Sequence, residues 1–183
     1  MSNLPHFNST WTLFLDRDGV INKKIENDYV KKWEEFHFLP GVLESLEKFN
    51  SVFGKILIVT NQQGIGKGAF TEKDLETIHK KMLEEIGKHR GRIDRIYFCP
   101  HLSSQNSTHR KPATGMGYDA LRDFPAIDLE KSLIAGDSIT DMIFGRDLGM
   151  YTVFIKDKMP SNPVEAKLID RHFTSLSDFA ASI

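Results

Sequence analysis

Cysteine is almost absent from this sequence, with only Cys99 among 183 residues. A lone cysteine cannot form an intrachain disulfide, so a disulfide-stabilised secreted scaffold is excluded and a reducing compartment is expected. No apolar run approaches the roughly 18 residues that a membrane-spanning helix needs. The first residues have neither the basic nor the apolar part of a secretory signal. We therefore expect a cytoplasmic protein without a membrane segment.

An excess of positive charge is also missing. Lys and Arg number 24 against 25 Asp and Glu, which gives a net charge of −1 with neutral histidines. A protein that holds a phosphate backbone needs basic residues in excess, so nucleic acid is not an expected partner. The length and the 40% of hydrophobic residues fit a single domain over residues 1–183, and we expect a monomer.

Short apolar runs alternate with longer amphipathic stretches, a pattern typical of strands and helices around a parallel sheet. We expect strands at 12–16, 55–60, 95–99, 132–136 and 151–155, and helices at 41–50, 115–123, 139–148 and 175–183. Another helix begins at Thr71, because Thr71 and Asp74 have the spacing of a capping box. Its apolar face is predicted to consist of Leu75, Ile78, Met82 and Ile86.

The segment 19–39 has no sustained periodicity. It combines basic residues with aromatic ones, namely Lys23, Lys24, Lys31, Lys32, Trp33, Phe36 and Phe38. Two interpretations are open: a flap over a site, or a surface excursion that its aromatic residues pin to the core.

Polar residues suited to phosphate chemistry follow four of the apolar runs. They are Asp16-Arg17-Asp18-Gly19, Thr60-Asn61-Gln62, Arg110-Lys111-Pro112, and Asp137 with Asp141. The carboxyl ends of parallel strands form one edge of a sheet, where ligands bind. These residues are therefore predicted to converge, although an isolated aspartate after a strand is more often a turn or cap residue.

The residue types in this set match the needs of phosphoryl transfer. Asp16 provides a carboxylate nucleophile, and Asp18 a second carboxylate that protonates the leaving oxygen and then deprotonates water. Asp137 adds an oxygen ligand for Mg²⁺. Lys111 and the hydroxyl of Thr60 stabilise the transferring phosphoryl oxygens. Asp141 has three open roles: it orients Lys111, joins the metal site, or stands in the first turn of a helix.

The order DRDG, Thr60, Lys111 and GDSITD resembles the four motifs of the haloacid dehalogenase-like phosphatases, over nearly the whole chain. The stretches FLDRDGVIN, VTNQQGIGKGAFT, CPH and RKPATGM resemble the capless branch that includes heptose-bisphosphate and histidinol-phosphate phosphatases. The resemblance implies a Rossmann-like three-layer α/β/α fold without a cap domain and a parallel sheet in the order 5-4-1-2-3. It also implies hydrolysis of a small-molecule phosphate ester, a sugar phosphate or bisphosphate or histidinol phosphate.

The resemblance also implies the roles of individual residues. Asp16 is the nucleophile, Asp18 the general acid and base, and Thr60 with Lys111 binds the phosphate. Mg²⁺ is held by Asp16, the backbone carbonyl of Asp18, and Asp137. Arg110 contacts the substrate beyond its phosphate and Asn61 shapes that pocket; the alternative for Arg110 is a loop arginine paired with a surface carboxylate.

One part of the family pattern is incomplete. That branch holds a structural zinc ion with Cys-x-His followed by Cys-x-Cys, and here Ser107 and His109 stand in place of the second pair of cysteines. Serine is not a zinc ligand of structural sites, so at most Cys99, His101 and His109 remain. We expect a metal-free loop, with zinc as the less favoured alternative.

Two other functions and one further residue remain open. TNQQGIGKG and RKPATGM also resemble the phosphatase domain of polynucleotide kinases, which suggests a polynucleotide 3′-phosphatase, although the balanced charge disfavours it. A catalytically idle binding module is the least favoured reading, because no motif residue is missing.

Lys67 is a candidate for a second phosphate, with a solvated surface lysine as the more favoured interpretation.

Overall fold

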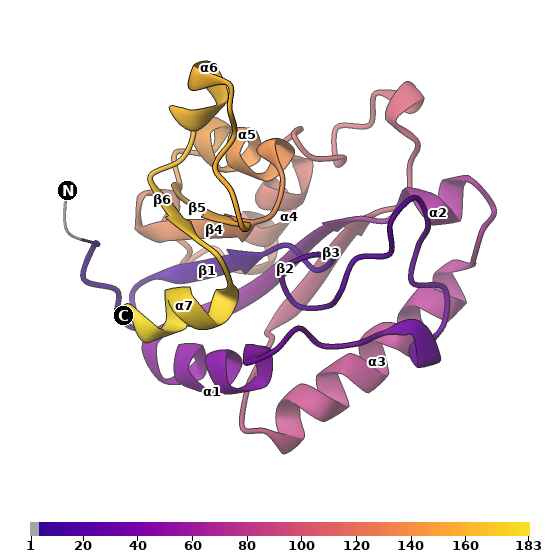
Figure 1. Ribbon diagram of the computed structural model, residues 1–183, viewed down its shortest axis with the longest axis horizontal. Helices are drawn as coiled ribbons and strands as arrows, with labels where there is room; N and C mark the ends of the chain where they lie inside the picture. The colour runs from indigo at the N-terminus through magenta and orange to yellow at the C-terminus, as the bar shows by residue number, and fades with distance from the viewer. Residues whose placement is uncertain (1–3) are drawn as a thin grey trace.

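A computed structural model describes residues 4–183, which fold around one parallel sheet between two helical layers (Figure 1). The six strands are β1 (Thr12–Leu15), β2 (Lys55–Asn61), β3 (Arg95–Cys99), β4 (Ser132–Gly136), β5 (Tyr151–Ile155) and β6 (Arg171–Phe173). Their order is β3-β2-β1-β4-β5-β6, and every neighbouring pair is parallel. This is the predicted order 5-4-1-2-3, read from the other edge, with β6 added beside β5.

The five predicted strands agree with the structure to within one residue at their ends. β1 ends at Leu15 and leaves Asp16 beyond the strand, while β2 continues to Asn61. The sequence did not predict β6, because its three half-buried residues include an arginine and a histidine and give no apolar run.

The helices are α1 (Val42–Val52), α2 (Gln63–Gly66), α3 (Glu72–Lys88), α4 (Gly115–Asp123), α5 (Ile139–Asp147), α6 (Pro163–Ala166) and α7 (Leu176–Ala181). The sequence missed the four-residue α2 and α6, which are too short to show a helical period. It also missed three single 3₁₀ turns, η1 (Trp33–Glu35), η2 (Ser103–Gln105) and η3 (Leu129–Lys131). Within residues 4–183, every helix is too short or too polar to cross a membrane.

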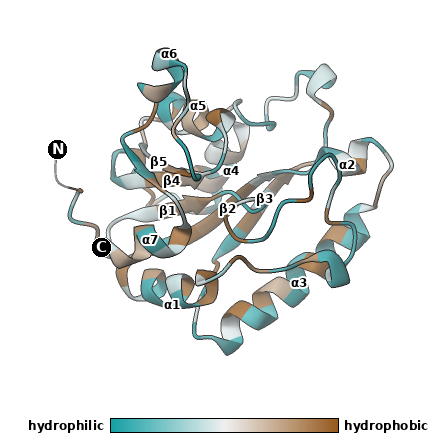
Figure 2. Cartoon of the chain, viewed as in Figure 1, coloured by the Kyte–Doolittle hydropathy of each residue, from teal (hydrophilic) through white to brown (hydrophobic). Residues whose placement is uncertain are grey.

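Each face of the sheet has its own hydrophobic core, because successive strand side chains point to opposite faces. Leu13 and Leu15 of β1 pack with α1, α3 and α7, whereas Phe14 between them packs with α4 and α5. Figure 2 shows the resulting hydrophobic interior. The predicted three-layer arrangement is confirmed, and it leaves the carboxyl edge of the sheet open to loops.

The segment 19–39 is pinned to the core by aromatic residues at one end and lines the pocket at the other; its role as a flap stays a prediction. The Trp33 and Phe36 rings stack with centroids 5.2 Å apart, and Phe36 meets Phe38 edge-on at 5.1 Å. Phe36 is buried in the core formed with α1 and α3. The aromatic residues thus anchor one end of the segment. Further toward its start, the pocket described below is lined by Lys24, Ile25, Asp28, Tyr29 and Val30.

Removing the capping box of α3 is expected to destabilise the protein. The Asp74 backbone N–H donates to Thr71 Oγ1 at 3.1 Å, and the Thr71 N–H donates to Asp74 Oδ2 at 2.8 Å. Thr71→Ala removes the cap and should lower the free energy of unfolding by about 1 kcal/mol in urea denaturation. Thr71→Ser retains the hydroxyl and serves as the control. Equal stability of the two variants would contradict the prediction.

Candidate active site

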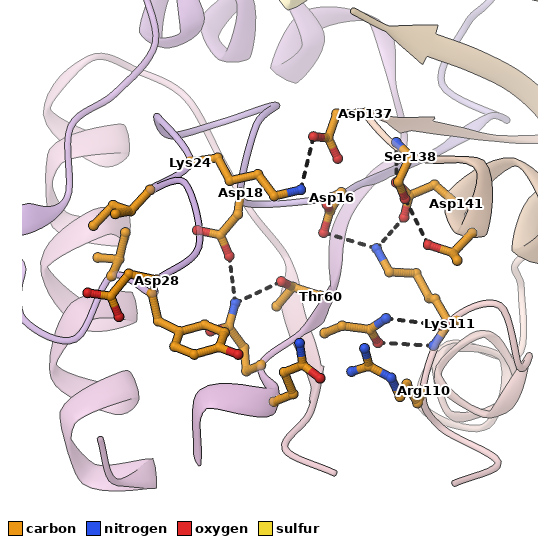
Figure 3. Close-up of a pocket in the computed structure, with 17 residues that line it drawn as sticks. Asp16, Asp18, Lys24, Asp28, Thr60, Arg110, Lys111, Asp137, Ser138 and Asp141 are labelled. Carbon is orange, nitrogen blue, oxygen red and sulfur yellow. Dashed lines mark hydrogen bonds and ion pairs between the residues drawn. The ribbon is translucent and has the colours of Figure 1, made fainter. Parts of the chain in front are cut away.

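One pocket at the carboxyl edge of the sheet collects all seven predicted site residues (Figure 3). Asp16 and Asp18 follow β1, Thr60 and Asn61 end β2, and Asp137 follows β4. The loop before α4 adds Arg110 and Lys111. The convergence predicted from the strand ends is therefore present.

Three buried carboxylates form the acidic part of this pocket. Asp16, Asp137 and Asp141 each place a carboxylate oxygen within 4.8 Å of the others. Burial raises the pKa of Asp16 to about 7; Lys111 opposes this rise, while Asp141 and Asp137 add to it. Burial also raises the pKa of Asp137, against the effect of Lys24. This concentration of negative charge favours a cation at the site.

Lys111 supplies a buried positive charge to the cluster. Its Nζ lies 2.9 Å from Asp16 Oδ1 and 2.5 Å from Asp141 Oδ1, and it donates to the Val59 carbonyl at 2.6 Å. Burial alone would lower the pKa of Lys111, but Asp141 and Asp16 outweigh it and the net pKa is raised. The lysine is therefore a permanent cation.

Asn61 holds the backbone of Lys111 in place. The Lys111 N–H donates to Asn61 Oδ1 and Asn61 Nδ2 donates to the Lys111 carbonyl, both at 3.0 Å. This reciprocal pair connects the end of β2 to the loop before α4. Asn61 shapes the pocket by fixing Lys111.

Asp141 has two of its three predicted roles at once: it stands in the first turn of α5 and it contacts Lys111. Its Oδ2 accepts hydrogen bonds from the Ser138 N–H at 3.1 Å and from Ser138 Oγ at 2.6 Å, which forms the capping box of α5. Its Oδ1 faces Lys111. The first turn of α5 thus orients the lysine directly.

One carboxylate oxygen of the acidic cluster is available as a ligand for a metal ion. Asp137 Oδ1 is buried and accepts no hydrogen bond within the described part of the chain, while Asp137 Oδ2 lies 3.3 Å from Lys24 Nζ. Buried carboxylate oxygens without a donor are costly unless a cation meets them. Oxygen ligands with room for water and phosphate are those that Mg²⁺ prefers. Asp16 and Asp137 therefore fit a Mg²⁺ ion.

Asp18 belongs to a separate network. Its carboxylate accepts hydrogen bonds from Arg17 Nη2 at 3.0 and 2.9 Å, from Asn22 at 2.9 Å and from Gln62 at 2.8 Å. Burial acts to raise its pKa, but the charge of Arg17 and these hydrogen bonds outweigh burial and the net pKa is lowered. Gln62 also donates to Thr60 Oγ1 at 2.9 Å, which ties the Thr60 hydroxyl to Asp18.

Three residues of this network had no role predicted from the sequence: Arg17 and Gln62, which stand in the predicted motifs, and His79, which does not. Arg17 is fully buried, and its Nη1 lies 3.1 Å from Nε2 of His79 in α3. Burial, and then the charge of Arg17, lowers the pKa of His79 to about 3. The signal available in the sequence was a histidine on the apolar face of α3, between Ile78 and Met82.

Arg110 and Lys67 differ in their relation to the pocket. Arg110 lines it, donates to the His101 carbonyl at 3.4 Å, and has no carboxylate within ion-pair distance among residues 4–183. The alternative of a surface ion pair for Arg110 is thus absent from the structure. Lys67 is exposed, and its Nζ lies 5.4 Å from the centre of the Tyr29 ring, so a phosphate role for it stays a prediction.

The residues that were candidate zinc ligands, in the loop that follows Cys99, are connected by hydrogen bonds instead. Ser107 Oγ lies 2.8 Å from His101 Nδ1 and 3.7 Å from Cys99 Sγ. His109 pairs instead with Asp119, with Nε2 3.1 Å from Oδ2. Cys99, His101 and His109 thus do not form a ligand set in the part of the chain that the structure describes. A zinc site there is not supported.

Comparison with known proteins assigns the family. The family model described as polynucleotide kinase 3 phosphatase matches residues 12–179. The D-glycero-alpha-D-manno-heptose-1,7-bisphosphate 7-phosphatase of Mycobacterium bovis is 34% identical over 94% of this chain and 91% of its own. This chain belongs to the haloacid dehalogenase-like phosphatases. Within them, it falls in the heptose-bisphosphate phosphatase branch.

Two further members of this phosphatase branch support the assignment. The D-glycero-beta-D-manno-heptose-1,7-bisphosphate 7-phosphatase of Helicobacter pylori strain 26695 is 40% identical over 75% of this chain and 79% of its own. A crystal structure of the D,D-heptose 1.7-bisphosphate phosphatase from B. bronchiseptica, complexed with magnesium and phosphate, has a TM-score of 0.81. It is 27% identical and covers 93% of this chain and 96% of its own.

His79 is expected to make the stability of the protein depend on pH. The unfolded histidine takes up a proton near pH 6.5 and the folded one only near pH 3. Between these values the unfolded state binds more protons, so the free energy of unfolding falls as pH falls, by up to about 1.4 kcal/mol per pH unit.

His79→Gln removes this titrating group and should flatten the pH dependence, measured by urea denaturation at several pH values. The exposed His37→Gln serves as the matched control and should follow the wild type. Parallel curves for His79→Gln and the wild type would contradict the prediction, because they would mean that folding does not change the pKa of His79.

Proposed function

We propose that this chain is a Mg²⁺-dependent phosphatase that removes the 7-phosphate of a heptose 1,7-bisphosphate through an aspartyl-phosphate intermediate. The observation that carries the proposal is the pairing of buried Asp16 with buried Lys111 in a pocket that also contains Asp18 and Asp137. Relatives that are named heptose-bisphosphate 7-phosphatases support the choice of substrate class.

In the first half of the reaction, an Asp16 carboxylate oxygen attacks phosphorus and the bond to the ester oxygen breaks. Lys111 and the Thr60 hydroxyl balance the charge that develops on the phosphoryl oxygens. Asp18 donates a proton to the departing sugar oxygen. Because Asp18 is ionised before substrate binds, the negative charge of the bound phosphate must raise its pKa for this step.

In the second half, Asp18 acts as a base. It takes a proton from a water molecule that attacks phosphorus, and the bond between phosphorus and Asp16 breaks. Inorganic phosphate leaves, Asp16 is again a free carboxylate, and Asp18 releases the proton taken from water to solvent once the phosphate has gone and its pKa falls again. The hydrogen bonds from Arg17, Asn22 and Gln62 favour the ionised form of Asp18 that this step needs.

Asp16 and Asp137, with the backbone carbonyl of Asp18, are the groups proposed to hold Mg²⁺. When bound, the ion supplies positive charge beside the phosphoryl oxygens and stabilises the ionised form of Asp16. Lys24 belongs to the segment 19–39 and pairs with Asp137. Its positive charge is therefore also close to the reacting phosphate group. Arg110 lines the outer pocket and is available for the part of the substrate beyond the reacting phosphate.

The cellular setting of the enzyme stays a prediction. The lone cysteine favours the cytoplasm, and a sugar bisphosphate substrate favours a role in carbohydrate metabolism. The balanced charge of the chain favours a small substrate over a nucleic acid and leaves the polynucleotide 3′-phosphatase as the alternative to be tested. A monomer remains the expected oligomeric state.

A substrate panel tests the function. With Mg²⁺ present, both anomers of D-glycero-D-manno-heptose 1,7-bisphosphate should be hydrolysed with higher kcat/KM than histidinol phosphate or a 3′-phosphorylated oligonucleotide. Asp16→Asn should lower kcat roughly 10⁴-fold or more, because the nucleophile is lost. Asp147→Asn, at the exposed end of α5, is the control and should keep wild-type activity. A preference for the oligonucleotide would reverse the assignment.

Metal removal separates the two metals considered for this chain. A chelator of divalent cations should abolish activity, and Mg²⁺ alone should restore it, because the acidic cluster requires a cation and the Cys99 loop is held by hydrogen bonds. Elemental analysis of the purified protein should find less than one zinc ion per ten chains. A zinc content near one per chain, or a need for zinc in reactivation, would contradict this.

A further inference from the structure

Arg17 is a guanidinium with no contact to solvent, in the middle of the motif that carries both catalytic aspartates. Its side chain is 1% exposed, and it is the largest fully buried side chain in the described part of the chain. Arginine keeps its charge and donates every hydrogen bond that it makes. The N–H groups of a buried guanidinium therefore need hydrogen-bond acceptors from the protein.

The acceptors around Arg17 come from three parts of the fold: Asp18 follows β1, Gln62 follows β2, and His79 lies in α3. Nη2 donates to both Asp18 oxygens and to Gln62 Oε1 at 3.3 Å, on the side of the pocket. Nη1 lies 3.1 Å from His79 Nε2, and Nε has no partner within residues 4–183. His79 is thus the acceptor that α3 offers to Arg17.

The geometry fixes the state of the imidazole. Since Arg17 can only donate, His79 Nε2 must accept, which requires a neutral ring with its proton on Nδ1. Burial beside a permanent cation disfavours the charged ring, in agreement with the lowered pKa of His79. His79 does not line the pocket and so does not touch the substrate there.

We propose that His79 is a positioning residue for Asp18, acting through Arg17. By accepting from Nη1, it fixes the plane of the guanidinium, and Nη2 then fixes the direction of the Asp18 carboxylate between Arg17, Asn22 and Gln62. Without this acceptor, Arg17 can rotate toward another partner and the Asp18 carboxylate loses its set orientation. The inference rests on the proposed function, in which Asp18 protonates the leaving oxygen.

The proposal predicts an effect that depends on the leaving group. His79→Leu removes the acceptor at similar volume and should lower kcat/KM for heptose 1,7-bisphosphate about 10- to 100-fold, because an alkoxide leaves poorly without a proton. For p-nitrophenyl phosphate, whose leaving group departs as a stable anion, the loss should be at most about 3-fold. Because kcat/KM reports the steps up to departure of the leaving group, it isolates the acid role of Asp18.

His79→Gln is the matched variant, because its amide oxygen can accept from Arg17 in place of Nε2. It should restore kcat/KM for the bisphosphate to within about 3-fold of the wild type. Melting temperatures are measured in parallel, with assays run where all three proteins are folded. Equal losses for both substrates in His79→Leu, or failure of His79→Gln to restore activity, would overturn the positioning role.

A measurement on the wild-type protein keeps the inference testable if His79→Leu does not fold. Nitrogen NMR of the histidine rings at neutral pH should show His79 with a protonated Nδ1 and an unprotonated Nε2. A proton on Nε2 would overturn the proposal. Failure of the wild type to hydrolyse either substrate would overturn the proposed function, whereas hydrolysis with equal losses in His79→Leu would overturn this inference alone.

Discussion

The ammonium group of Lys111, buried between Asp16 and Asp141, is the interaction on which the pocket depends. It contacts the first residue after β1 and the first turn of α5, and it donates to a carbonyl of β2. Removing one partner of a buried ion pair leaves an uncompensated charge and costs about 3–5 kcal/mol. Lys111 therefore joins β1, β2 and α5 into one site and at the same time makes burial of the acidic cluster possible.

Arg17 is a second buried cation, and its charge lowers the pKa of the neighbouring Asp18. Asp16 and Asp18 are two residues apart, yet the pKa of Asp16 is raised to about 7 and that of Asp18 is lowered. Asp16 shares Lys111 with Asp141 and stands beside Asp137, whereas Asp18 has the charge of Arg17 and three hydrogen-bonding neighbours. Environment, not residue type, thus gives the two carboxylates opposite pKa shifts, which is what the two proposed roles require.

Two loops on either side of the site are held in place by different interactions. Ser107 connects Cys99 and His101 by short polar contacts, so the loop that leads to Arg110 is held by hydrogen bonds. On the opposite side, stacked Trp33 and Phe36 anchor the segment that brings Lys24 to Asp137. These two segments bring Arg110 and Lys24 to the lining of the pocket.

The sequence by itself determined the alternation of strands and helices, the α3 capping box and the convergence of polar strand-end residues, because these follow from local periodicity, caps and strand ends. The strand order and the places of Asn61 and Arg110 in the pocket came from the resemblance to the phosphatase family. It did not determine β6 or the partners of His79, Ser107 and Asp141. β6 forms only because β5 offers it an edge. The partner of a buried polar group is set by residues distant in the chain, Arg17 and His79 being 62 positions apart. Such pairings exist only once the layers have packed.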